Sequence, residues 1–336
     1  MRRSIEELLT VWQALAGCST EADGWRGIPL ASAGTCRLMA ARKFPDNEEA
    51  LLAGFQSAAL AGDERLPEGK GFMVIRADPY GDGKTWIALT RKESGNLELF
   101  AEMVGDVAAA MDGAAHDGEA CVMLTLLHRV RLWQQFMARG ANSLGPEAEL
   151  GLVGELDFMR VMLDAGVSIE EVLKGWVGPE DATQDFLIGT GAIEVKATLS
   201  TSGFPVKIGS LEQLDDSFIA PLFLAAVRFS RCEGGLTLPE LVAEVQQRVA
   251  GESGAVDHLR RELMVAGYVE AHAPIYTRRF EMLERRILSV SEGFPRLTPG
   301  VIPAGIFRTV YQIDLDHAGN FVTDIDTTLR ALGVST

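Results

Sequence analysis

A short segment between residues 185 and 196 carries the side chains best suited to chemistry in this chain. Asp185 precedes a three-residue apolar run and a turn bounded by Gly189 and Gly191, and Glu194-Val195-Lys196 follows. Carboxylate and carbonyl oxygens are the ligands that Mg²⁺ prefers, and a nearby lysine can activate water or stabilise a charged phosphate. The segment therefore predicts a hairpin that supports metal-dependent hydrolysis of a phosphodiester.

The hairpin must satisfy one geometric condition. If residues 193–199 form a strand, Glu194, Lys196 and Thr198 share one face and the apolar residues share the other, buried face. Asp185 joins the Glu194 face only if the loop between the strands has an even number of residues, or if a bulge intervenes. The alternative is a half-exposed strand whose Glu/Lys face is simply solvated.

A further carboxylate, Glu155, falls within the apolar arc of a predicted helix that carries Leu152, Leu156 and Met159. A carboxylate on that arc is unfavourable unless a cation or a hydrogen-bond donor meets it. Pairing with an arginine such as Arg160 is one explanation, and a place in the catalytic site is the other. In the second case Asp185, Glu194 and the Val195 backbone carbonyl hold the metal ion, and Glu155 completes the shell through a water or a second ion.

These residues resemble the motifs of the PD-(D/E)XK nuclease superfamily. The resemblance rests on residues 151–156, Asp185 and Glu194-Val195-Lys196, and it is closest to a bacterial family described only as PD-(D/E)XK motif proteins. Trp133, residues 210–214 and residues 294–296 extend it over most of the chain, while Gln184 replaces the nominal proline. It implies a restriction-endonuclease-like core of α/β (α+β) class, with Glu155, Asp185, Glu194 and Lys196 as catalytic residues and Mg²⁺, or Mn²⁺ in vitro, as cofactor.

The resemblance also implies double-stranded DNA as the substrate. A glutamine after the catalytic strand contacts DNA or orients the nucleophile in related nucleases, which makes Gln213 a candidate, with Lys207 and Ser210 beside it. Ser210 and Gln213 also fit a helix capping box, with serine at the N-cap and glutamine at N3. Both interpretations stay open at this point.

Members of the resembled family tend to lie in defence loci beside DNA methyltransferases and ATPase-type proteins. The resemblance therefore implies a DNA endonuclease of a restriction-modification or phage-defence system, acting with such subunits or as a homodimer that cuts both strands. The alternative is a non-catalytic DNA-tethering or scaffold subunit of a defence complex. An RNA-directed nuclease is a third, weaker alternative.

Composition sets limits on these hypotheses. The net charge of −16 predicts weak DNA affinity for the isolated chain, although residues 228–296 are neutral and their basic residues are all arginine, several in pairs. Those arginines either form a local basic face or pair with nearby glutamates. The four cysteines are scattered without a C-x-x-C pair, which argues against zinc and disulfides and predicts a cytoplasmic protein. The longest apolar run, residues 218–227, is too short to cross a membrane.

Three domains are expected. Residues 1–140 read as a mixed α/β domain, with a helix from Leu8, a strand pair in residues 71–90 and a further strand at 121–127. Residues 141–227 form the predicted nuclease core, separated by a linker at residues 140–146. Residues 228–336, opening at Gly234-Gly235, read as an α+β domain that is either a winged helix or an ordinary subdomain.

Overall fold

The chain forms two compact units, residues 1–142 and 143–336. The computed structural model describes residues 5–17, 23–30, 33–138, 142–180, 182–306 and 308–334. Cys18 and the first residues of the predicted linker, Gly140 and Ala141, lie outside the described residues. The fold is mixed α/β, as predicted.

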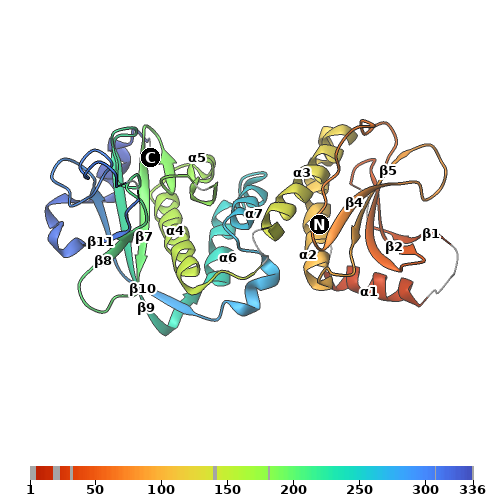
Figure 1. Ribbon diagram of the computed structural model, residues 1–336, viewed down its shortest axis with the longest axis horizontal. Coiled ribbons are helices and arrows are strands. Elements are labelled where there is room, and N and C mark those ends of the chain that lie inside the picture. Colours follow the sequence, from red (N-terminus) through yellow and green to blue (C-terminus); the bar gives the residue numbers. More distant parts are fainter. Residues whose placement is uncertain are drawn as a thin grey trace. The chain divides into compact units, whose positions relative to one another are not determined.

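The first unit is an antiparallel sheet with helices (Figure 1). The strands lie in the order β1-β2-β3-β5-β4, and helix α1 buries Leu8, Trp12 and Leu15, which recur at helical spacing. The expected strand at residues 121–127 is wrong, because this run lies inside helix α3. The elements are α1 (Ile5–Ala16), β1 (Gly24–Pro29), β2 (Arg37–Phe44), β3 (Glu48–Phe55), β4 (Phe72–Ala77), β5 (Thr85–Arg91), α2 (Leu97–Gly113) and α3 (Glu119–Ala138).

The second unit is built on a mixed five-stranded sheet of order β12-β10-β9-β7-β6. Among the strands that the structure describes in this sheet, the β7–β9 pair is parallel and the other pairs are antiparallel. A separate two-stranded sheet pairs β8 with β11. The elements are α4 (Pro146–Asp164), α5 (Ile169–Gly175), β6 (Phe186–Ile188), β7 (Gly191–Thr198), β8 (Pro205–Ile208), β9 (Leu222–Thr237), α6 (Leu238–Val249), α7 (Ala255–Val265), β10 (Arg279–Ser289), β11 (Tyr311–Asp314), β12 (Val322–Thr323) and α8 (Ile325–Ala331).

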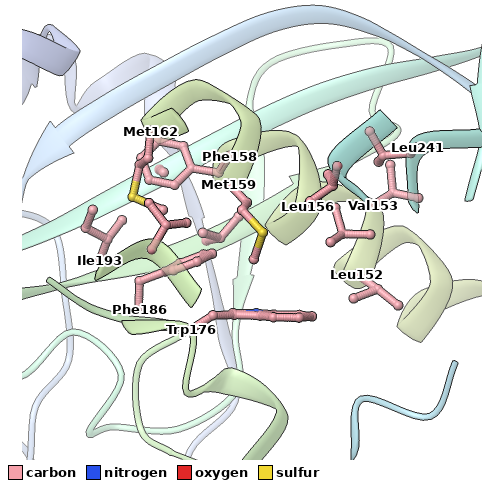
Figure 2. Close-up of a cluster of buried hydrophobic side chains, with 14 of the residues drawn as sticks. Leu152, Val153, Leu156, Phe158, Met159, Met162, Trp176, Phe186, Ile193 and Leu241 are labelled. Atoms are coloured by element: carbon pink, nitrogen blue, oxygen red, sulfur yellow. The ribbon is translucent and has the colours of Figure 1, made fainter. Parts of the chain in front are cut away.

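Both faces of this sheet are covered near β7. Ile193 and Val195 belong to one buried cluster with residues of α4, α5, α6 and α7 (Figure 2). Ala192 belongs to a second cluster on the other face, with residues of β8 and β11. Side chains alternate along a strand, so Glu194 and Lys196 project to the same side as Ala192. Strand β7 is therefore buried on both faces from Gly191 to Val195, and a charged residue there needs a specific environment.

The predicted boundary at residue 228 does not exist. Strand β9 runs through it from Leu222 to Thr237 and pairs with β10 over most of that length. Gly234-Gly235, taken as a boundary signal, lies inside β9, and a side chain at Gly235 would come within 2.5 Å of the Phe280 backbone. The described residues after 228 thus belong to the second unit instead of forming a separate winged-helix domain. No helix in the described parts of the chain is long and apolar enough to cross a bilayer.

Candidate active site

The β6–β7 hairpin meets the condition that the sequence placed on it. Phe186 pairs with Ile193 and Ile188 pairs with Gly191, which leaves a two-residue loop. One step beyond the Phe186 pair, Asp185 stands opposite Glu194 and on the same face. The Asp185 side chain is held there by the backbone amide of Val195, which donates to Asp185 Oδ2 at 2.7 Å. The amide of Val195 thus contacts the acid, and the role of its carbonyl as a metal ligand stays a prediction.

Glu194 and Lys196 form a direct ion pair on this face. Lys196 Nζ donates to Glu194 Oε1, and the lysine side chain keeps 18% of its exposure while that of Glu194 keeps none. The other carboxylate oxygen, Glu194 Oε2, is buried and has no hydrogen-bond partner within the described part of the chain. A buried, unpartnered carboxylate oxygen is costly and points to a ligand that the protein binds in use.

Glu155 approaches the same place from helix α4. Its Oε2 accepts a hydrogen bond from Trp176 Nε1 at 2.7 Å. The alternative pairing with Arg160 is excluded, because Arg160 contacts Asp157 and Glu244. An added Cβ on Gly178 would lie 2.9 Å from Asp185 Oδ1 and 3.3 Å from Glu155 Oε2, so both oxygens face one small space.

The electrostatics of the site follow from three carboxylates around one lysine. Burial, followed by the charge of Asp185, raises the pKa of Glu155 to about 8. Burial also raises the pKa of Asp185, and burial together with the Asp185 charge raises the pKa of Glu194 well above its usual range. Burial opposes the charge of Lys196, but Glu194 and Asp185 outweigh it and raise the lysine pKa. The raised pKa values show that negative charge is unfavourable in the metal-free cluster, so that a divalent cation would displace protons from it when it binds.

The donor set fits a hard divalent ion. Asp185 and Glu194 are opposite one another, and the free Glu194 Oε2 is an oxygen ligand of the kind that Mg²⁺ takes. However, among the described residues no three acidic, histidine or cysteine side chains already converge in metal-binding geometry. Lys196 occupies one oxygen of Glu194, so ion binding requires a small rearrangement of these side chains.

The three predicted substrate-binding residues lie outside this cluster. Residues 209–221 form turns and bends, so the helix and the capping box expected at Ser210 are wrong. Gln213 Oε1 accepts from the Gly209 amide at 2.7 Å and closes this loop on itself. Lys207 lies exposed on β8, 3.5 Å from the exposed Glu147. The structure does not bring these residues to the carboxylates.

Sequence reasoning missed three residues that support the site. Gln184, at the nominal proline position, is buried and donates from Nε2 to the carbonyls of Glu212 and Gln213 at 3.2 and 3.3 Å. It thereby joins the 209–221 loop to the start of β6. Trp176 and Gly178 contact Glu155 and Asp185 from the segment after α5. No local pattern marks either residue, since their role depends on tertiary contacts.

A groove of about 810 Å³ begins where β7 ends. Leu199, Ser200 and Thr201 line one side, and residues 228–231 of β9 line the other. Arg228 in this groove is paired with Glu284, whereas Arg231 is exposed and makes no ion pair with a described residue. At about 3.3 Å per residue, the groove starts roughly 10 Å along the strand from Lys196.

The arginine pairs of residues 228–296 form mostly internal ion pairs. Carboxylates lie within ion-pair distance of Arg260, Arg278, Arg279, Arg285 and Arg286. Arg278 meets the fully buried Glu149, and Arg285 meets the buried Asp157 of α4. Of the two alternatives left open by the sequence, pairing with carboxylates therefore describes these five residues.

The fold and the site together define a class of protein. A helix bearing a glutamate flanks a hairpin that carries an aspartate on one strand and Glu-x-Lys on the next, as the PD-(D/E)XK resemblance implied. The sequence matches the family described as "Putative PD-(D/E)XK family member, (DUF4420)" over residues 8–316, and the chain belongs to that family. No curated protein and no solved structure matches the chain significantly.

Proposed function

We propose that the protein is a divalent-metal-dependent nuclease that hydrolyses phosphodiester bonds of double-stranded DNA. The observation that carries the proposal is the pairing of Asp185 with Glu194 on one face, next to Lys196 and beside a carboxylate oxygen without a partner. Glu155 adds a third carboxylate. This set of groups suits an anionic substrate only if a cation joins it, because three carboxylates would otherwise repel a phosphate.

Each residue of the site has a defined task in this proposal. Asp185 and Glu194 hold Mg²⁺, or Mn²⁺ in vitro, and the ion supplies Lewis-acid stabilisation of the phosphate. Lys196, whose pKa is raised by Glu194 and Asp185 in spite of burial, stays an ammonium ion and stabilises the negative charge of the transition state. The oxygen of a water molecule bonds to phosphorus and the water gives up one proton, the bond from phosphorus to one sugar oxygen breaks, and that sugar oxygen takes up a proton.

The groove beyond β7 offers a path for one DNA strand. Arg231 and the hydroxyl groups of Ser200, Thr201 and Ser230 line it, and such groups bind phosphate oxygens. Most arginines in the described part of this unit pair with carboxylates, and the chain carries a net charge of −16. We therefore expect weak affinity for DNA, and a partner subunit or a second copy that strengthens binding.

The resemblance of the motifs supports a proposal for the biological setting. We propose that the protein acts in a bacterial restriction-modification or phage-defence system, in the cytoplasm, with methyltransferase and ATPase subunits as partners. In the part of the chain that the structure describes, Cys36, Cys121 and Cys232 form no disulfide, which suits a reducing compartment.

A cleavage assay tests the proposed activity. Purified full-length protein is incubated with supercoiled and linear DNA in Mg²⁺, Mn²⁺ or EDTA, with and without the products of neighbouring genes. We expect ion-dependent cutting by the wild type and a loss of at least a hundredfold in Asp185→Asn and Lys196→Met. Asp78→Asn, in an exposed turn of the first unit, is the matched control and should cut normally.

Two results would contradict the proposal. Equal cutting by Asp185→Asn and wild type would show that the activity comes from another site or a contaminant. No cutting by the wild type under any of these conditions would favour the non-catalytic scaffold. Cutting of RNA but not DNA would correct the substrate while leaving the site in place.

A further inference from the structure

The segment Trp176-Val177-Gly178 links the two carboxylates that come from different elements. Trp176 Nε1 donates to Glu155 Oε2 at 2.7 Å. The amides of Val177 and Gly178 both donate to the Asp185 carbonyl at 3.0 Å. The chain immediately after α5 therefore fixes Glu155 through its side chain and Asp185 through its backbone.

The Trp176 ring is itself firmly held. It is 2% exposed and packs in the cluster that Figure 2 shows, next to Phe186 and below α4. An indole N–H is a donor only and carries no charge. It can orient the Glu155 carboxylate without neutralising it, unlike a lysine or arginine in the same place. A cation that displaces the proton from Glu155 therefore meets a carboxylate whose charge no side-chain cation has neutralised.

Gly178 keeps a space open between the carboxylates. Its missing Cβ would lie 2.9 Å from Asp185 Oδ1 and 3.3 Å from Glu155 Oε2. The first separation is one that real Cβ atoms essentially never show, and the second requires a neighbour to move. The two oxygens thus point at the same small volume, which a methyl group would fill.

We propose that Trp176 and Gly178 are positioning residues for a divalent cation. Trp176 turns Glu155 toward Asp185, and Gly178 leaves the room in which Asp185 Oδ1 and Glu155 Oε2 reach the cation or a water bound to it. This inference rests on the proposed function, since it concerns the same site. It adds to that proposal two residues outside the motif.

A purely structural role makes a different prediction. A buried tryptophan needs an acceptor for its N–H, and Trp12 shows this ordinary case by donating to the Ala50 carbonyl at 3.1 Å in the first unit. If Trp176 only fills the core, its replacement lowers stability and leaves cation affinity unchanged. If Trp176 positions Glu155, its replacement lowers both the stability and the affinity for the cation.

Mn²⁺ binding measured by calorimetry on the full-length protein separates the two roles. We expect Gly178→Ala to weaken Mn²⁺ binding at least tenfold and Trp176→Phe to weaken it about threefold, with DNA absent. The matched controls are Gly151→Ala, on the same helix as Glu155 with nothing within 4 Å of the added Cβ, and Trp12→Phe. Both controls should keep wild-type affinity, although Trp12→Phe will melt at a lower temperature.

Thermal melting of every variant accompanies the titrations. If Gly178→Ala fails to fold, the test rests on the Mn²⁺ affinity of Trp176→Phe compared with that of the control Trp12→Phe. Wild-type affinity in folded Gly178→Ala and Trp176→Phe overturns the inference and leaves the proposed nuclease intact if the wild type still binds Mn²⁺ and cuts DNA. A wild type that binds no Mn²⁺ overturns both.

Discussion

The Val195 amide donates a 2.7 Å hydrogen bond to Asp185 Oδ2 and so fixes the aspartate opposite Glu194. This contact links the strand that carries Glu-x-Lys to the acid at the start of the preceding strand. It leaves Asp185 Oδ1 free to face Glu155 across Gly178. Backbone pairing therefore sets Asp185 and Glu194 side by side, while a side-chain contact from Trp176 holds Glu155.

The metal-free protein should lose stability as pH rises. The pKa of Glu155 is about 8 in the fold, chiefly through burial, against a usual value of 4.5, so the folded state holds a proton that the unfolded state has lost. Stability of the second unit then falls between about pH 4.5 and pH 8, by up to roughly 1.4 kcal/mol per pH unit, and levels off above.

Thermal unfolding in EDTA from pH 5 to pH 9 checks this dependence. Glu155→Gln should reduce the loss of stability with rising pH. Part of the loss should remain, because Asp185 and Glu194 have raised pKa values too. Adding Mn²⁺ should restore stability at pH 8. An unchanged slope in Glu155→Gln would be evidence against a buried, protonated Glu155.

Glu119 should stabilise the first unit at neutral pH, and this effect should disappear in acid. Burial would raise its pKa, but hydrogen bonds from the amides of Gln56, Ser57 and Ala58 and from the Ser57 hydroxyl lower it to about 2. The Glu119 carboxylate therefore stabilises the folded first unit above pH 4.5, and this stabilisation is lost as the pH falls toward 2.

Glu119→Gln tests the role of that charge. We expect a loss on the order of 2 kcal/mol at pH 7 that shrinks toward pH 2, measured by urea unfolding. Glu98→Gln, exposed in the first turn of α2, is the control with little effect. A Glu119→Gln loss that is independent of pH would show that shape, and not charge, matters there.

Asp157 should be among the most sensitive positions of the second unit. Its side chain is 2% exposed and pairs with Arg285 on β10 and with Arg160 on its own helix. Asp157→Ala leaves two partly buried arginines without this partner, which typically costs about 3–5 kcal/mol. Asp164→Ala removes an exposed pair with Arg248 and should cost about 0–1 kcal/mol. Calorimetric unfolding that gave similar losses for both variants would contradict this difference.

Arg231 should contribute to DNA binding but not to folding. In the inactive Asp185→Asn background, Arg231→Ala should weaken binding to duplexes of any sequence and reduce the slope of log affinity against log salt by about one. Arg248→Ala makes the same charge change on α6, away from the groove, and should leave the slope unchanged. Fluorescence anisotropy measures the DNA affinity of both variants at several salt concentrations. Equal slopes for the two variants would show that DNA does not bind in the groove.

The hairpin could be predicted from the sequence because its constraints are local. A two-residue loop and the alternation of strands suffice to set Asp185 on the Glu194 side. The misplacement of Glu155 on an apolar arc was also visible, since helical periodicity depends only on spacing. The hydrogen-bond partner of Glu155 could not be predicted, because Trp176 lies twenty-one residues away and no pattern of residue types links the two.

The errors share a cause in long-range packing. The run at 121–127 is apolar enough for a strand, but it lies in a twenty-residue helix that packs against α2. Gly234-Gly235 is typical of a loop, yet Gly235 allows the β10 backbone to approach β9 closely. The Ser210 capping box satisfied a local rule, while the loop instead closes through Gln213 and Gln184.

The central claim is that Asp185 and Glu194 act on one divalent ion. Diffraction from Mn²⁺-soaked crystals at the manganese absorption edge tests it most directly. We predict one strong anomalous peak within about 2.3 Å of an oxygen of each carboxylate, absent in Asp185→Asn. A soaked crystal with no peak there, or with the peak unchanged in Asp185→Asn, would contradict the account.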